Sequence, residues 1–212
     1  MLDLGLFTRR GFVAGAAVIA LQNLAMYSLL VQVPFLFGSR SGGGGSRLSL
    51  AIVAMTATMA ATSPLGGRLA EWAGLRSVVM SGGLLGAVGI ASLARLASDA
   101  SALSVGFRLL FVGLGLGLST GPSQAGALGA VETRQSGMAA AALAMLRYIG
   151  GIAGTIILGY ALAGRGAEAA SRQHVALWMF ASAFLVSAVC GLGLSSATHR
   201  AGVASGAAGQ SG

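Results

Sequence analysis

The sequence contains no lysine, only one cysteine and very little charge of either sign. Charged residues make up 8% of the 212 residues, whereas soluble domains carry about 25%. Such an inventory cannot cover a folded domain with a water-facing surface. Cys190, the single cysteine, lies within an apolar run, which excludes a disulfide framework and indicates a small packing residue.

The common enzyme sites are missing as well. A Walker phosphate loop requires a lysine, and the glycine run at 113–117 lacks the third glycine of a dinucleotide-binding turn. His174 and His199 are too isolated to form a metal site or a catalytic triad. We therefore expect no enzymatic activity, no cofactor and no bound metal.

The formal net charge of +8 comes entirely from arginine. Nucleic-acid binding would require a basic face with interleaved aromatic residues, whereas these arginines occur singly or in pairs between apolar runs. Arginines that flank membrane helices explain the charge better, so we expect a lipid bilayer as partner and no nucleic acid.

Apolar residues are what the sequence has in abundance: they make up 55% of the chain, at a mean hydropathy of +0.83. A helix needs about 20 apolar residues to cross the hydrocarbon core of a bilayer. The first apolar run is too long for a signal-peptide core and has no cleavage site after it, so it is expected to stay. The runs occupy residues 11–37, 48–66, 78–96, 103–124, 137–163 and 175–194.

We predict an all-α integral membrane protein whose core is a bundle of six transmembrane helices. Residues 1–10 form a lead-in, residues 11–195 the bundle, and residues 196–212 a disordered tail. Arg68, Glu71 and Arg76 are the only formal charges between residues 48 and 94, and they predict a tight charged turn between the second and third helices. The other connectors are predicted at 38–47, 97–101, 131–136 and 164–172.

An even number of spans puts both chain termini on one side of the membrane. The positive-inside rule orients a bundle by the arginines and lysines of its loops, but the terminal side holds six arginines and the opposite side five, so the rule hardly separates the two orientations. The two sets are Arg9, Arg10, Arg68, Arg76, Arg134 and Arg200, and Arg40, Arg47, Arg95, Arg165 and Arg172.

Glycines recur at every fourth residue in several of the predicted helices. This spacing brings small residues to one helix face and favours close packing of backbones over a ligand site. Pro122 removes a backbone hydrogen bond and is predicted to bend or end the fourth helix. The packing positions are Gly113, Gly117 and Gly121 in the fourth helix and Gly150, Gly151 and Gly154 in the fifth.

Arg147 is the sharpest candidate for a functional residue. It lies ten residues into the fifth apolar run, which at about 1.5 Å per residue is roughly 15 Å deep. A charge at that depth usually faces a bundle interior or an aqueous cavity, although snorkelling or carbonyl pairing is the alternative. All five acidic residues fall in loops, so we expect its partner on another six-helix unit, on a substrate or in cavity water.

Polar residues of the first helix are further cavity candidates. Asn23 and Tyr27 are four residues apart and share a helix face, and Gln22 lies beside them. Hydrogen bonding between helices explains these residues equally well, so both interpretations stay open.

Three stretches resemble a known family. Gly67-Arg-Leu-Ala-Glu71-Trp-Ala-Gly74-Leu-Arg76 is similar to the G-x-x-x-D-R-x-G-R-R signature between the second and third helices of each half of major facilitator superfamily transporters. Here Glu71 stands for the Asp, and a tryptophan replaces the first basic residue. Residues 137–154, around Arg147, resemble the G-x-A-x-G…R-x-x-G-G-x-x-G pattern late in the fourteen-helix drug/proton antiporters, and residues 2–12 resemble the segment entering the second half of that branch.

The resemblance implies the C-terminal half of a facilitator transporter in the cell inner or plasma membrane, with both termini cytoplasmic. It implies proton-driven export of drug-like or amphipathic small molecules. It further implies that Gly67, Arg68, Glu71, Gly74 and Arg76 form a cytoplasmic gating motif, in which Glu71 and Arg76 help lock the closed state.

The chain also departs from that family. It begins where the family already has an N-terminal helix bundle, and it has no carboxylate within its spans to carry a proton. We therefore expect a partner unit, either an N-terminal half of six to eight helices or a second copy. The alternative is a homodimeric or non-transporting six-helix membrane scaffold or accessory subunit.

Overall fold

The computed structural model describes residues 4–37, 45–96, 100–163 and 166–194. Across these residues the structure is entirely helical, as the composition predicted. The helices are α1 (Arg10–Phe37), α2 (Gly45–Ala73), α3 (Leu75–Ala94), α4 (Ala102–Gly129), α5 (Ser136–Leu162) and α6 (Gly166–Cys190), with short 3₁₀ turns η1 (Leu4–Thr8), η2 (Thr133–Gln135) and η3 (Gly191–Gly193).

Six spans of the described chain are long and apolar enough to cross a membrane, each with 20 to 30 residues and a mean hydropathy between 1.5 and 2.1. A hydrocarbon core about 30 Å thick requires about this length. The prediction of six membrane-spanning helices is confirmed at this level, and the chain is a multi-pass membrane protein by length and composition.

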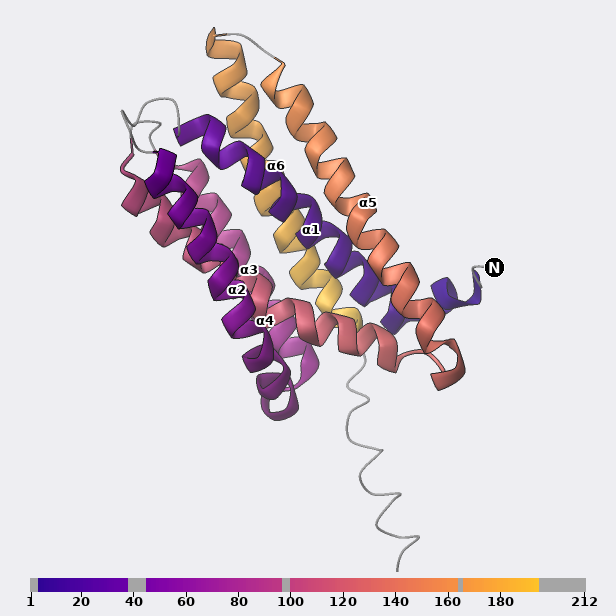
Figure 1. Ribbon diagram of the computed structural model, residues 1–212. Helices are drawn as coiled ribbons and strands as arrows, with labels where there is room; N and C mark the ends of the chain where they lie inside the picture. Colours follow the sequence, from indigo (N-terminus) through magenta and orange to yellow (C-terminus); the bar gives the residue numbers. More distant parts are fainter. Residues whose placement is uncertain (1–3, 38–44, 97–99, 164–165, 195–212) are drawn as a thin grey trace, which may run out of the picture.

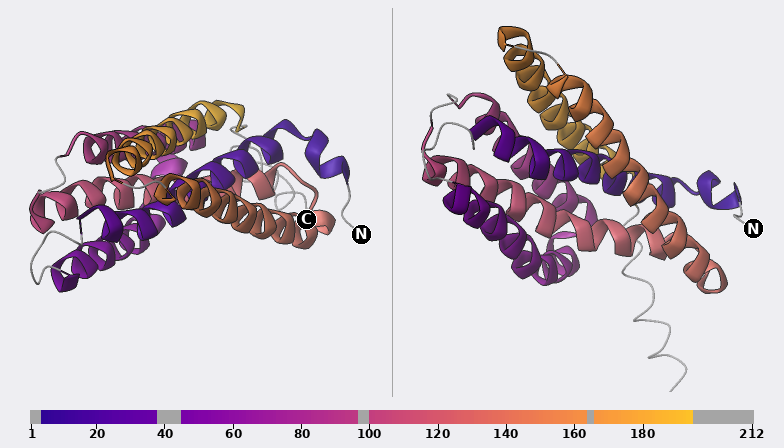
Figure 2. Two further views of the ribbon diagram at one scale, coloured as in Figure 1. Left: turned by 90° about the horizontal axis from the view of Figure 1, so that it is seen from above. Right: turned by 45° about the horizontal axis from the view of Figure 1, so that its top comes forward.

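The helices pack around α1 and α4 (Figure 1). α1 contacts α4, α5 and α6, and α4 also contacts α2 and α3, while α6 closes the bundle against α3. α2 and α5 lie at opposite margins of the bundle in both figures (Figure 2). Only 22% and 33% of their most apolar stretches are buried, against 44–56% in the other four helices. These two helices therefore present most of their apolar surface outward.

Large apolar side chains fill the centre. The main core cluster joins α1, α3, α4 and α6 through residues such as Ile90, Leu116, Phe180 and Phe184, all of them at most 1% exposed. Burying such side chains contributes about 1.5–3 kcal/mol each in water. Within a bilayer this term fades, because lipid is as apolar as leucine, and close packing holds the helices together instead.

Each helix reverses the direction of the one before it. The start of α1, the α2–α3 turn, the α4–α5 turn and the end of α6 consequently gather at one end of the bundle (Figure 1). Two contacts fasten this end. Arg9 forms an ion pair with Glu132 (2.7 Å) across to the α4–α5 turn, and Nε of Arg76 donates a hydrogen bond to the carbonyl of Leu194 (2.5 Å).

The predicted end of the second helix at residue 66 is wrong. α2 continues through Pro64 to Ala73, so most of the charged stretch is helical. Gly66 serves the packing of α2 rather than a turn, because a Cβ there would collide with the backbone carbonyl of Leu118 in α4. The change of direction falls on Gly74 alone, whose φ of 83° lies in the left-handed region that glycine tolerates.

Other boundaries differ in the same sense, with helices longer than predicted. α4 runs past Pro122 to Gly129, so the proline does not end it. α6 begins at Gly166, and most of the predicted polar loop at 164–172 forms its first turns, where Glu168 and Arg172 pair one turn apart. The predicted connector at 38–47 lies outside the described residues except for 45–47, which start α2. The predicted tail at 196–212 lies outside them entirely.

Candidate functional site

The polar residues of α1 do not share one environment. Gln22 is only 1% exposed and lies between two neighbouring helices. Its Oε1 accepts a hydrogen bond from the hydroxyl of Ser119 in α4 (3.0 Å), and its Nε2 donates to the hydroxyl of Ser187 in α6 (3.4 Å). Gln22 therefore joins three helices and has its amide occupied, which favours the interhelical interpretation over a cavity role.

Asn23 and Tyr27 have different surroundings. The side-chain amide of Asn23 donates back to the carbonyl of Ile19 in its own helix (2.8 Å). The ring of Tyr27 is half-buried and points at α5, where a Cβ added at Gly151 would lie 2.7 Å from its Cδ2. Tyr27 thus reaches the helix that carries Arg147, whereas Asn23 turns to its own backbone.

The predicted packing glycines lie at close helix contacts. A Cβ at Gly150 or Gly154 would run into the backbone carbonyls of Ala20 and Leu24 in α1. Gly113 and Gly117 face α2 in the same way, against the carbonyls of Met55 and Met59, while Gly121 has an ordinary contact of 3.5 Å with the carbonyl of Ser63. The glycine face of α5 sets its position on α1, and with it the position of Arg147 one turn away.

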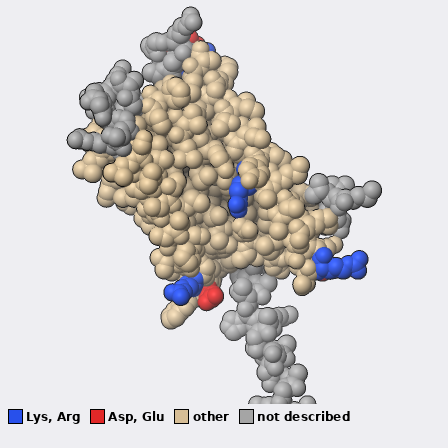
Figure 3. Space-filling model, in the orientation of Figure 1, with Lys and Arg blue, Asp and Glu red and all other residues tan. Residues whose placement is uncertain are grey.

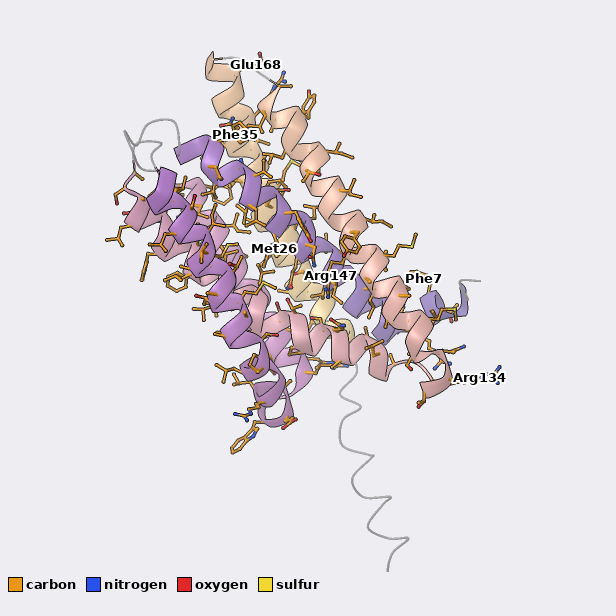
Figure 4. The ribbon with its side chains drawn as sticks, viewed as in Figure 1. Phe7, Met26, Phe35, Arg134, Arg147 and Glu168 are labelled. Atoms are coloured by element: carbon orange, nitrogen blue, oxygen red, sulfur yellow. The ribbon has the colours of Figure 1, made fainter. Side chains whose placement is uncertain are left out.

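Arg147 lies in the middle of a broad face of the bundle, at the α4 side of α5 (Figure 4). It follows the start of α5 at Ser136 by eleven residues, which is about 16 Å along the helix. In Figure 3, drawn in the same orientation, a single blue patch stands at this place within an otherwise tan surface. The guanidinium therefore sits at mid-span and reaches the surface of the bundle.

One hydrogen bond holds the Arg147 side chain. Its Nη2 donates to Oε1 of Gln124 in α4 at 3.1 Å. Its Nε is buried and has no hydrogen-bond partner among the described residues. Since α4 and α5 otherwise touch little, this hydrogen bond is the main polar link between them at mid-span.

Arg147 has no counter-charge within the described part of the chain. Glu132 pairs with Arg9 at one end of the bundle, Glu168 pairs with Arg172 at the other, and Glu71 is exposed near the end of α2. A lone charge at mid-membrane is expensive and is retained where it meets a ligand, a partner or water. The guanidinium of Arg147 therefore has no ionic partner among the described residues.

Gln124 is a residue of this site that no sequence pattern indicated. It stood at the predicted end of the fourth helix, two residues after Pro122, where a polar side chain needs no explanation. The length of the helix would have indicated it: because α4 continues to Gly129, Gln124 is a polar residue inside a membrane span.

The residues of the predicted gating motif have different surroundings: three are exposed, whereas Arg76 joins two elements. Arg68 and Glu71 are exposed, and neither forms an ion pair with another described residue. Gly67 has open space where a Cβ would be. Arg76 contacts Leu194 instead of Glu71, so within this chain it fastens the residue after η3 to the start of α3.

Two of the cavities in the described structure lie away from Arg147. One of about 730 Å³ lies between the start of α4 and α2, lined by residues such as Leu50, Leu103 and Phe107. The other, of about 470 Å³, lies beside Phe7 and Cys190. Within the described ranges no three His, Cys, Asp or Glu side chains gather in a way that could hold a metal ion.

In the part of the chain that the structure describes, six helices are long and apolar enough to cross a membrane, which places the protein in the class of multi-pass membrane proteins. No protein-family model matches the chain, and the curated proteins contain no significant match to it.

Proposed function

We propose that the chain is one half of a small-molecule efflux transporter of the major facilitator type. It acts with a second six-helix unit and exports drug-like or amphipathic compounds in exchange for protons. In facilitator-type transport, two six-helix halves rock around a site near the bilayer midplane. The half supplied by this chain contributes the face that carries Arg147.

The observation that carries the proposal is the uncompensated guanidinium of Arg147. A helix bundle surrounded only by lipid would hold a bare cation in hydrocarbon, at a cost of about 2.5–3.5 kcal/mol on insertion scales and more by other estimates. The half-buried side chain lies at mid-span on a face flanked by the two least buried helices, α2 and α5. A second unit placed over this face turns the exposed charge into part of an internal site.

One further observation supports the proposal. Arg147 with Gly150, Gly151 and Gly154 resembles the antiporter pattern, and the glycines lie against α1 as packing residues. The cytoplasmic termini are part of the proposal through the resemblance alone, because the loop arginines divide six to five between the two sides.

The test is transport in proteoliposomes under an imposed proton gradient. The chain is reconstituted alone and together with a co-expressed N-terminal six-helix half, and uptake of a fluorescent amphipathic compound is followed. We expect proton-driven transport only in the combined sample.

Transport by the chain alone would overturn the half-transporter proposal. If the chain then behaved as a dimer, the homodimeric alternative would take its place. If neither sample transported and the two halves also failed to co-purify, the proposal that the chain assembles with an N-terminal six-helix half would be refuted as well.

A further inference from the structure

We infer that Arg147 and Gln124 form a binding site for the carboxylate of an amphipathic small molecule. The inference rests on the proposed function in treating this anion as cargo, although the binding itself is tested without transport. It names the chemical class of the ligand, a monovalent organic anion attached to an apolar body.

The arrangement of donors comes first. Gln124 accepts from Nη2 of Arg147 at 3.1 Å and so turns the guanidinium toward α4. Nη1 has no hydrogen bond with any described residue, and the buried Nε has no partner either. The Nε–H lies parallel to an N–H of Nη2 rather than of Nη1, and Nε is buried, so the unused N–H groups of Nη1 are the donors open to a carboxylate oxygen, in a charge-assisted hydrogen bond.

Charge selects among anions. The site has one cation, and the described carboxylates all lie toward the ends of the bundle rather than at mid-span. A carboxylate or a sulfonate would neutralise the site, whereas a doubly charged phosphate would leave an excess charge at a depth where charge is costly. A small inorganic ion would also have to give up its hydration for a single partner.

The surroundings select the rest of the ligand. On α5, Ala144 and Tyr148 beside Arg147 are both exposed, Tyr148 by 62%. Ala144 lies three residues before Arg147 and shares its face. A small residue and an aromatic ring offer contact area for an apolar body and no second charge, so the ligand is amphipathic rather than a free ion.

The experiment measures binding to the full chain in nanodiscs of zwitterionic phosphatidylcholine. The probes are 1-pyrenebutyrate and its neutral amide, and the amount retained by empty nanodiscs is subtracted. We expect the carboxylate to bind at least ten times more tightly than the amide.

Variants locate the effect. Arg147→Gln should reduce carboxylate binding to the level of the amide, and Arg147→Lys should weaken it less because the charge stays. Gln124→Glu keeps Arg147 but places a carboxylate beside its Nη2, so this variant should stay folded and lose binding through an internal counter-charge. Arg108→Gln is the matched control: Arg108 donates to the carbonyl of Ser104 near the start of α4, and its loss should leave the preference unchanged.

Three results would overturn the inference: equal binding of acid and amide, a preference that survives Arg147→Gln, or a preference lost equally in Arg108→Gln. The counter-charge could instead be a carboxylate of a second unit. In that case the wild-type chain would associate without any preference for the acid, and Arg147→Gln would separate the units. Selective binding combined with failed transport would leave this site standing and refute only the proposed function.

Discussion

The two sides of α1 handle polarity in opposite ways. Toward α4 and α6, Gln22 is buried and its amide is hydrogen-bonded to Ser119 and Ser187. Toward α5, the contact is made by glycines against backbone carbonyls of α1. The polar residue at the margin of this contact, Arg147, has one hydrogen bond and a guanidinium that reaches the surface of the bundle. Both polar side chains lie within membrane spans, yet only Gln22 has both polar atoms of its side chain hydrogen-bonded inside the bundle.

The difference separates a structural role from a functional one. A buried amide whose partners come from neighbouring helices holds those helices in register. A charged group left open serves no such purpose and is tolerated only where something else binds it. The degree to which a polar side chain is satisfied within the chain therefore says more about its role than its depth does.

The largest effect is expected for Arg147→Leu. In a membrane-insertion assay of the 136–162 segment, this change should lower the apparent insertion free energy by about 3 kcal/mol, because arginine at a helix centre costs about 2.5–3.5 kcal/mol. The control is Arg108→Leu in the 102–129 segment, which should give a smaller gain because Arg108 lies six residues from the start of α4. Equal gains would mean that Arg147 carries no special cost.

The next effect concerns the glycine contact. Gly154→Ala should destabilise the bundle by about 1–3 kcal/mol, the range for overpacking, since the new methyl would strike the carbonyl of Leu24 and lie 2.5 Å from Oγ of Ser28. Unfolding in detergent measures the loss. Gly159→Ala, on the same helix with open space around it, should not destabilise, and similar losses for both would refute the packing role.

A smaller loss is expected for Gln22→Leu. Removing the amide leaves the hydroxyls of Ser119 and Ser187 without this partner, and hydrogen bonds between membrane helices average about 0.6 kcal/mol each. The expected destabilisation is about 1 kcal/mol in the same unfolding assay. A double-mutant cycle with Ser119→Ala should show coupling, and strictly additive effects would contradict the network.

The smallest effect is expected for Gln124→Leu. Gln124 is half-buried and makes one hydrogen bond, with Arg147, so its loss should change the unfolding free energy by about 0.5 kcal/mol or less. Together with Gln22→Leu, this variant compares the stability contribution of a glutamine hydrogen-bonded within the bundle with that of the glutamine that binds Arg147. A larger loss for Gln124 than for Gln22 would reverse our assignment of roles.

Much of the fold follows from hydropathy alone. Runs of about 20 apolar residues leave a chain no alternative to helices in a bilayer, because backbone polar groups must be satisfied within the segment. Helix ends were harder to predict. The charges Arg68, Glu71 and Arg76 predict a turn directly after residue 66, but Gly66 packs against Leu118 in α4 and α2 continues to Ala73.

The candidate site was predictable in part. The depth of Arg147 is a count along the sequence, and so is the spacing of Gly150 and Gly154. The partners of Gln22 and the role of Gln124 depend on how α1, α4, α5 and α6 are aligned against one another, and spacing within a single helix carries no information on that alignment. Arg76 shows the same limit, because its contact with Leu194 joins residues 118 positions apart.

The single-residue corner at Gly74 has a mechanical consequence. α2 and α3 meet with no loop between them, so no slack exists to absorb a change in the tilt of α2. The first turn of α3 is fastened through Arg76 to Leu194, just after the 3₁₀ turn that follows α6. A tilt of α2 against α4 must therefore either rotate the backbone at Gly74 or displace α3 and, through Arg76, the segment that follows α6. Movement of α2 is in this way coupled mechanically to the C-terminal end of α6.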